Sequence, residues 1–493
     1  MMDVKKLDNE NNKHESHLTE KKITLSLFKF IMLLLTAVIL TAAVTAFAML
    51  GGSEKVYEQQ SPKRSEFLKL YQVYDTLNSN YYKDVNKEKL IDGAIKGMVN
   101  GLDDPYSEYM TKSEQQEFSD SMSGDFQGIG AEMGEEGDKI IITSPIKGAP
   151  ADKAGIKPND EIVEIDGKST KGMNSMNVVK KIRGKKGTTV TLTLKRDNDD
   201  PFKVKIKRDT VHVNSVETKM LKNKVALITV TKFQEGTAAE FNEALKDMDK
   251  QGMQKLILDF RNNPGGYLDE ATKMANEFIG MGDVLFYTEK NHDKVKAFKA
   301  ENPANPITND LPTVIILNEG SASASEVFAA ALNDHDKAEI VGTKSFGKGI
   351  VQTAAPYKDD SMLKFTQMKW LTPDKTWIHK KGITPDQTIE LPVYANIHIL
   401  DPDEVYVEGE SSSKVKSLET GLKALGYNPG KVDKTFDEDT TLSVQQFQQE
   451  EGLEITGKMT GDSTVKFTEL LRKKLNDNDT QLKGAVDYIK SVQ

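Results

Sequence analysis

Three serines and a lysine stand at the spacing that nucleophilic catalysis could use in this chain of 493 residues. Ser321, Ser323 and Ser325 alternate with alanines within residues 320–326, and Lys348 follows Ser323 by twenty-five residues, between two glycines. The apolar residues after the serines share one helical face, which places Ser323 at the N-terminus of a predicted helix. Unpaired N–H groups and the positive end of the helix dipole can stabilise an oxyanion there, and the Ala324 N–H is the first expected donor.

Lys348 is the residue expected to act as a base toward Ser323. It lies in a glycine-flanked turn that looks exposed, and Gln352 follows it by four residues, at a spacing that keeps both side chains on one face. A lysine base must lose its proton near neutral pH, which requires its pKa to fall by roughly three units from about 10.4, or about 4 kcal/mol. We therefore expect a largely dry pocket in which Gln352 holds the amine of Lys348.

A structural interpretation of the same residues stays open. Residues 323–326 also fit the capping box, in which a serine and a glutamate only satisfy helix-end amides. The histidines offer no better base, because none has a triad-like setting. His335 lies between Asp334 and Asp336, but neighbouring residues at a helix end seldom converge on one ion and no H-E-x-x-H motif occurs, so we expect no metal site.

Residues 321–352, together with the segment 259–266 that reads D-F-R-N-N-P-G-G, resemble the C-terminal processing peptidases, also called tail-specific proteases. The resemblance implies a serine protease without a cofactor, with the family's catalytic serine, lysine and glutamine at Ser323, Lys348 and Gln352. It implies that Gly265 or Gly266 contributes to the oxyanion hole. It also places the essential aspartate of some members at Asp334, but eleven helical residues span about 16 Å, which favours a structural role there.

The length of the chain predicts about three domains, and its N-terminal part contains an apolar run. Residues 30–50 are uncharged and long enough to cross a bilayer, and lysines precede them, so we expect a retained transmembrane anchor with the N-terminus in the cytoplasm and the rest outside. The sequence Ala-Phe-Ala at residues 46–48 leaves a cleaved signal peptide as the alternative.

Composition excludes several classes of function. The chain contains no cysteine, which excludes disulfides, thiolate nucleophiles and zinc–thiolate sites. Its formal net charge is −9, and no basic patch interleaved with aromatic residues occurs, so we expect no nucleic-acid partner.

Polar and helical segments flank the apolar run. Residues 1–29 form a polar cytoplasmic head, 51–63 a linker, and 64–120 a helical segment with apolar residues at helical spacing. The family resemblance implies that this segment assists homodimer formation. Packing of these helices against the protease core is an equally good alternative.

Residues 124–208 resemble a PDZ domain. A glycine loop at residues 126–133, an alanine-rich helix near residue 150 and a strand ending in Asp166 and Gly167 occur in the required order. The backbone N–H groups of Ile129, Gly130 and Ala131 are expected to bind the carboxylate of a peptide C-terminus while the peptide adds as a strand. A purely structural module is the alternative.

Residues 209–400 alternate between strand and helix patterns, which predicts an α/β core. We expect strands at 225–230, 255–260 and 313–317 and helices at 238–248 and 268–278. Both the glycine loop at 263–266 and the Ser323 loop then follow strand C-termini, where open α/β sheets bind ligands. The family resemblance implies a crotonase-like fold for this core.

The C-terminal part is predicted to be an all-α domain. Residues 401–414 are acidic and serine-rich and are interpreted as a linker, and residues 414–475 resemble a peptidoglycan-binding helical domain. The usual D-G-x-F-G motif reads D-K-T-F-D at residues 433–437, without either glycine, so a protein-docking role stays open beside glycan binding.

These observations predict a multidomain α/β protein with a transmembrane helix, a helical segment, a PDZ domain, a protease core and an all-α C-terminal domain. The expected function is that of a membrane-anchored serine endopeptidase which acts outside the cell membrane and selects polypeptides partly by their C-termini. A non-catalytic scaffold that holds partners through its PDZ and wall-binding domains is the rival hypothesis. The presence of Ser323, Lys348 and Gln352 argues against it.

Overall fold

The structure is a computed structural model that describes residues 65–137, 139–197, 199–290 and 295–491, and it divides into compact units at Leu90/Ile91. The predicted anchor at residues 30–50 and the linker at 51–63 lie outside the described residues. Within the described ranges, no helix combines the length and the apolar character that a bilayer crossing requires.

Three helices make up the N-terminal segment after a single 3-10 turn at Ser65–Phe67. They are α2 (Leu68–Asn80), α3 (Lys87–Asn100) and α4 (Lys112–Ser123). None of the residues in α2 is buried, although its sequence has the predicted amphipathic spacing. A capping box begins α4, because Glu114 accepts hydrogen bonds from the backbone N–H and the hydroxyl of Thr111.

The PDZ region is a small β-rich domain around its own apolar core. Its central sheet has the order β3-β4-β5-β7-β8, with β6 on β5, and the short pair β2 and β9 lies beside it. The elements are β2 (Asp125–Gly128), β3 (Ala131–Glu136), β4 (Lys139–Pro145), α5 (Pro150–Lys153), β5 (Glu161–Ile165), β6 (Lys168–Ser169), α6 (Ser175–Ile182), β7 (Thr189–Lys195), β8 (Phe202–Lys207) and β9 (Asp209–His212).

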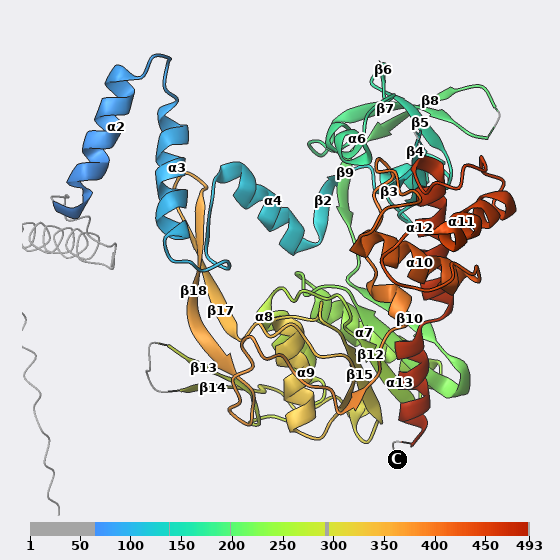
Figure 1. Ribbon diagram of the computed structural model, residues 1–493. Coiled ribbons are helices and arrows are strands. Elements are labelled where there is room, and N and C mark those ends of the chain that lie inside the picture. The colour runs from blue at the N-terminus through green and yellow to red at the C-terminus, as the bar shows by residue number, and fades with distance from the viewer. Residues whose placement is uncertain (1–64, 138, 198, 291–294, 492–493) are drawn as a thin grey trace, which may run out of the picture. The chain divides into compact units, whose positions relative to one another are not determined.

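A six-stranded sheet forms the centre of the next domain (Figure 1), and all the expected strands and helices are present in it. The order is β10-β11-β12-β15-β16-β19, parallel except for β10 on β11. The elements are β10 (Val216–Met220), a 3-10 turn (Lys222–Lys224), β11 (Val225–Val230), α7 (Thr237–Lys250), β12 (Lys255–Asp259), α8 (Leu268–Asn276), a 3-10 turn (Pro306–Thr308), β15 (Thr313–Leu317), α9 (Ala324–Asp334), β16 (Glu339–Gly342) and β19 (Gln387–Thr388).

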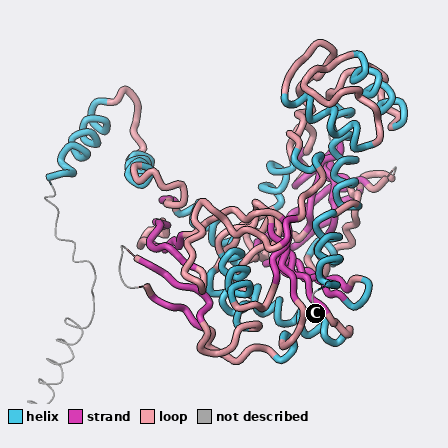
Figure 2. The backbone as a smooth tube through the Cα atoms, turned by 60° about the horizontal axis from the view of Figure 1, so that its bottom comes forward, coloured by secondary structure: helices cyan, strands magenta, loops and turns pink. Residues whose placement is uncertain are grey.

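Helices cover both faces of this sheet, which explains why its central strands are continuous apolar runs. Alternate strand residues such as Ile228 and Leu258 face α7, α8 and α9 in the largest apolar cluster of the described chain. The intervening residues, such as Ile257 and Ile316, face α13 (Thr480–Ser491) through Ala485 and Ile489. Figures 1 and 2 show the strands between these two layers.

A second sheet extends the protease domain and carries the lysine motif at its margin. Its order is β1-β18-β13-β14, with β17 paired to β18. The strands are β1 (Glu108–Met110), β13 (Val284–Glu289), β14 (Lys296–Lys299), β17 (Ile350–Pro356) and β18 (Met362–Leu371). Lys348 lies in the turn immediately before β17, and Gln352 lies within that strand.

The C-terminal domain is helical, as predicted, but it begins earlier than its helices suggest. Its helices are a 3-10 turn (Val393–Asn396), α10 (Ser413–Leu425), α11 (Glu438–Glu450) and α12 (Gly461–Asp477). Leu400 and Tyr406 are buried in its core, and Tyr406 pairs with Met459. The acidic segment at 401–414 is therefore part of this domain and not a linker.

Candidate active site

Ser323 lies at the junction between β15 and α9, in a backbone conformation that serine rarely adopts. Its φ is 57° and its ψ is −114°. A non-glycine residue with positive φ costs free energy and persists where the surrounding structure holds it, often at a functional site. The next N–H, that of Ala324, is a free N-terminal donor of α9 and has no acceptor among the described residues.

The glycine loop that follows β12 packs directly against this serine. A methyl group on Gly265 would lie 2.9 Å from the Ala324 nitrogen and 2.9 Å from Ser323 Cβ, so only glycine permits the close approach. The N–H of Gly265 already donates to Asn263 Oδ1 at 2.9 Å. The N–H of Gly266 has no acceptor within the described chain, so of the two glycines Gly266 retains a donor for a ligand.

Two buried serines join the loop after β15 to the loop after β12 by hydrogen bonds. Ser321 Oγ donates to the carbonyl of Phe260 at 2.9 Å, and Ser325 Oγ donates to the carbonyl of Asn263 at 3.0 Å. Both hydroxyls are therefore occupied in holding the loop after β12 against the loop after β15. This leaves Ser323 as the serine of the motif that is accessible from the adjoining pocket.

The turn that carries Lys348 is half-buried and held from several sides, in contrast to its exposed look in the sequence. Trp370 Nε1 donates to the Lys348 carbonyl at 2.8 Å, and Trp377 Nε1 donates to the Gly349 carbonyl at 2.8 Å. The ammonium group lies 5.1 Å from the ring centre of Tyr106. Burial, with a smaller contribution from the charge of Lys364, lowers the pKa of Lys348 below its usual value.

Glu326 connects the serine turn to the lysine turn. Its Oε2 accepts the N–H of Ser323 and the N–H of Lys348, both at 2.8 Å. Its Oε1 accepts the hydroxyl of Ser345 and the N–H of Gly347, both at 2.6 Å. Burial raises the pKa of this carboxyl, against the opposing effect of those four donors. Glu326 therefore forms the predicted capping box, and the same carboxylate also fixes the position of the lysine turn relative to Ser323.

One pocket of about 370 Å³ brings most of the predicted site residues together. Ser323, Lys348, Gln352, Gly265 and Gly266 all line it. The side-chain nitrogen of Gln352 is buried and has no hydrogen-bond partner among the described residues. A buried amide that lacks a partner is unusual in a folded protein and fits a group that awaits a ligand or a mobile side chain.

Asp334 lies elsewhere, at the C-terminal end of α9, and it does not line the pocket. Its Oδ2 accepts the N–H of Asp374 at 2.9 Å, which fits the structural role expected from its distance along the helix. The neighbouring His335 bonds the carbonyl of Val284 through Nε2. Within the described ranges no group of histidine and acidic side chains is arranged to hold a metal ion.

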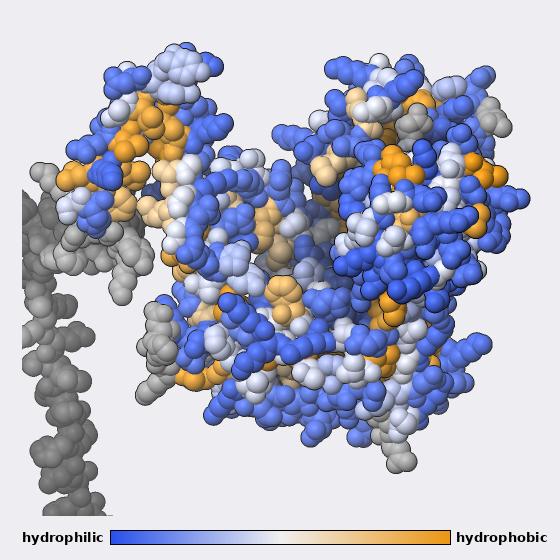
Figure 3. All heavy atoms as spheres, viewed as in Figure 1, coloured by the Kyte–Doolittle hydropathy of each residue, from blue (hydrophilic) through white to orange (hydrophobic). Residues whose placement is uncertain are grey.

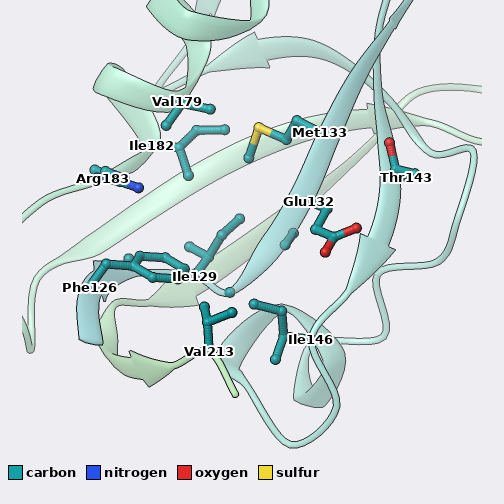
Figure 4. A pocket seen from close by; sticks show the side chains of 13 residues that line it. Phe126, Ile129, Glu132, Met133, Thr143, Ile146, Val179, Ile182, Arg183 and Val213 are labelled. Carbon is teal, nitrogen blue, oxygen red and sulfur yellow. The ribbon is translucent and has the colours of Figure 1, made fainter. Parts of the chain in front are cut away.

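A second pocket, of about 560 Å³, lies in the PDZ domain (Figure 4). The N–H groups of Ile129 and Gly130 have no acceptor in the described chain, and Ala131 begins β3 beside them. Gly130 has a φ of 72°, and a methyl group there would meet Ala149 at 2.4 Å. The walls are mostly apolar, and the guanidinium of Arg183 lies 5.0 Å from the ring centre of Phe126.

The sequence does not predict the role of two groups near the active site. Residues 323–326 indicate only a capping role for Glu326, and nothing in the sequence singles out Arg261. The buried partners of Glu326 are backbone N–H groups on a distant turn, and Arg261 pairs with Asp479, 218 residues away. No local pattern announces either contact.

Four family profiles cover most of the chain. The profile for peptidase family S41 matches residues 224–389, and one for domains like the N-terminal domain of the activating protease CtpB matches 40–114. The PDZ domain profile matches 117–195, and the profile described as "Putative peptidoglycan binding domain" matches 411–464.

Curated relatives span nearly the whole length. A protein of Staphylococcus haemolyticus named "Probable CtpA-like serine protease" is 46% identical over 97% of this chain and 96% of its own. One of Staphylococcus aureus with the same name is 44% identical over the same shares. Among solved structures, the photosystem II D1 C-terminal processing protease is 27% identical, with a TM-score of 0.39 over 65% of this chain and 88% of its own. Identity of this extent with the curated relatives, together with the S41 profile over the pocket-forming domain, shows that the chain belongs to peptidase family S41 and is a C-terminal processing serine protease of the CtpA-like group.

Proposed function

We propose that this protein is a membrane-anchored endopeptidase that works outside the cell membrane through a serine–lysine dyad. Ser323 is the nucleophile, and Lys348 is the base that accepts its proton and later returns a proton to the leaving amine. The observation that carries the proposal is the shared pocket, in which Ser323 and a half-buried Lys348 with a lowered pKa occur together. Gln352 orients the neutral lysine, because its buried side-chain nitrogen has no partner among the described residues and can donate to the unprotonated amine. No cofactor takes part.

The oxyanion hole uses two backbone donors on neighbouring loops. The Ala324 N–H supplies one, at the positive end of α9, and the N–H of Gly266 supplies the other, since the Gly265 N–H is bonded to Asn263. Gly265 contributes by its lack of a side chain, which lets the loop approach Ser323.

The test compares digestion of denatured casein by the wild-type ectodomain with that by three single variants and by the double variant Ser323→Ala/Lys348→Ala. Ser323→Ala, Lys348→Ala and Lys348→Arg should each be inactive, the last because arginine stays charged near neutral pH. The double variant should be no worse than either single one. The acidic limb of kcat/KM should follow a single proton, with activity rising as Lys348 deprotonates. Activity retained in Lys348→Arg contradicts the lysine base, and an inactive wild type favours a scaffold.

The PDZ domain selects substrates by their C-termini in this proposal. The free N–H groups of Ile129 and Gly130, with that of Ala131, bind the terminal carboxylate, and the apolar pocket accepts the last side chain. Charge-assisted hydrogen bonds of this kind contribute about 1.5 to 3 kcal/mol each. Amidation of one substrate's C-terminus should therefore raise KM. It should also lower kcat, because in this proposal the bound terminus aligns the substrate with the protease site. Equal rates for the free acid and the amide would remove the PDZ domain from selection.

The anchor at residues 30–50 and the C-terminal domain place the enzyme between membrane and wall. The apolar run, the preceding lysines and the peptidoglycan binding profile at 411–464 support this arrangement. Fractionation should recover the full chain with membranes, and the ectodomain should sediment with purified peptidoglycan. Recovery of a chain shortened near residue 48 would favour a cleaved signal peptide instead.

A second copy of the chain is the expected partner of α2. Leu70, Val73 and Leu77 form a stripe on this helix, and each is at least 39% exposed. Figure 3 shows hydrophobic side chains gathered over α2. An apolar stripe of this kind is typical of an interface. Light scattering on the ectodomain should give a dimer that Val73→Lys dissociates, whereas a monomeric wild type would contradict the assignment.

A further inference from the structure

Arg261 lies at the start of the loop that leads to Gly265 and Gly266, and two carboxylates hold its guanidinium. Asp259, the last residue of β12, accepts from Nε at 2.9 Å and from Nη2 at 2.6 Å. Asp479 accepts from Nη1 at 2.8 Å and from Nη2 at 2.7 Å. Only 16% of the arginine side chain is exposed, so the pairing takes place largely out of water. Bidentate contacts fix the direction of a guanidinium as well as its position.

Asp479 lies between α12 and α13, at the point where the chain returns from the C-terminal domain to the protease sheet. Its Oδ1 also accepts the N–H of Leu482 at 2.9 Å, which makes it the capping residue of α13. Burial alone would raise the pKa of Asp479, but the hydrogen bonds and the charge of Arg261 outweigh it, so the pKa is lowered. The same two carboxylates raise the pKa of Arg261 against the effect of its burial.

Two further hydrogen bonds hold the backbone after Arg261 to residues at the ends of β11 and β15. The Asn262 N–H donates to Asn318 Oδ1 at 2.8 Å, and the side chain of Asn263 donates to the Val230 carbonyl at 2.8 Å. These bonds hold the middle of the loop. The arginine holds its beginning, where the chain leaves β12 and turns toward Ser323.

We propose that Asp479 is a positioning residue for catalysis: through Arg261, the C-terminal helix sets the direction in which the Gly265–Gly266 backbone meets Ser323. This inference rests on the proposed role of the Gly266 N–H in the oxyanion hole. A donor that is slightly misdirected stabilises the transition state less while substrate binding is unchanged, so the effect falls on kcat. A purely structural role would instead lower stability and leave kcat intact.

The experiment uses a variant that removes the charge pairing of Asp479 with Arg261 but keeps its capping of α13. Asp479→Asn keeps a good helix cap and the same size but removes the charge and one of the two carboxylate oxygens. Ile489→Ala is the matched control, because Ile489 is buried where α13 packs on the apolar face of the sheet, beside Ile257 and Ile316. Its truncation loosens the same helix by an apolar route. Both variants are made in the full ectodomain, with Ser323→Ala beside them.

We expect Asp479→Asn to lower kcat about tenfold with KM within twofold, which is less than the loss of a whole oxyanion donor. Asp479→Glu should recover part of the rate, and Ile489→Ala should lower Tm while kcat stays within twofold. A kcat within twofold of wild type for Asp479→Asn overturns the positioning role, as does an equal fall in kcat for both variants. Activity in Ser323→Ala would instead overturn the proposed function itself.

Discussion

Replacement of Glu326 by glutamine is the sharpest test of how the two catalytic turns are held together. The carboxylate accepts four hydrogen bonds, two on each oxygen, and an amide of the same shape offers only one acceptor oxygen. The amide nitrogen must then face two of the former donors. The consequence depends on which pair it faces.

The better orientation keeps the amide oxygen on the N–H groups of Ser323 and Lys348. The amide nitrogen then faces Ser345 and Gly347. The hydroxyl of Ser345 can turn and accept, but the N–H of Gly347 cannot. One buried N–H is left without a partner, which costs about 1–3 kcal/mol. The opposite orientation leaves two N–H groups without an acceptor and costs about twice as much.

Urea unfolding followed by tryptophan fluorescence measures this cost in the right domain. The chain has two tryptophans, and Trp370 and Trp377 both donate to the lysine turn. We expect Glu326→Gln to lower the unfolding midpoint of the protease domain. We also expect kcat/KM to fall about a hundredfold, since repulsion at Gly347 displaces the turn that carries Lys348.

Glu270→Gln is the control for Glu326→Gln. Glu270 is equally a buried carboxylate of the same domain, but its partners are the N–H of Ala238 and the mostly exposed ammonium of Lys273. A glutamine can keep the first bond, and water can replace the second. This variant should stay close to wild type. If Glu326→Gln kept both its midpoint and its activity, the bridging role of the carboxylate would be refuted.

Three further predictions concern other parts of the chain. Gln352→Ala should lower kcat/KM about tenfold and shift its acidic limb, because the amide then no longer orients the proposed base; an unchanged profile would exclude that role. The protonated ring of His212 donates to the carboxylates of Glu240 and Asp125, and these bonds, that to Glu240 first, raise the pKa of His212. The stabilising effect of His212 is therefore complete below about pH 6.5 and is lost as pH rises through the higher folded value. Tm of the wild type should fall over that range, and His212→Gln should flatten the curve. Asp334→Asn should keep kcat within twofold, and a loss above a hundredfold would make the aspartate catalytic.

The sequence predicted the parts of the fold whose signals are local. The strand at 225–230 and the strand at 313–317 match β11 and β15 residue for residue, because each is a short β-branched run between polar turns. Ser323 could be located because a tight glycine and alanine setting preceded an apolar helical face. Lys348 could be singled out by its glycine-flanked turn and by Gln352 four residues later, and the family resemblance named the same residue.

The missed features depend on contacts that sequence periodicity does not encode. The apolar residues of α13, such as Ala485 and Ile489, follow the end of a domain that already looked complete, so nothing marked them as the cover of a distant sheet. The segment at 401–414 is polar enough to be interpreted as a linker, yet Tyr406 fixes it within a core. Most donors to Glu326 are backbone N–H groups, and since nearly every residue carries one, the residue types in the sequence do not identify them.

Because the chain returns to the protease sheet through α13, the C-terminal domain is attached to that sheet at two points. The domain leaves the protease sheet after β19 and re-enters it at α13, and the two crossing points are bonded to each other, since Thr480 and Gln481 donate to the carbonyls of Glu390 and Ile389. It is therefore an insertion with two tethers and not a tail on one flexible joint. A load applied to this domain would reach the catalytic sheet at two points, the β16–β19 strand pair and the packed helix α13.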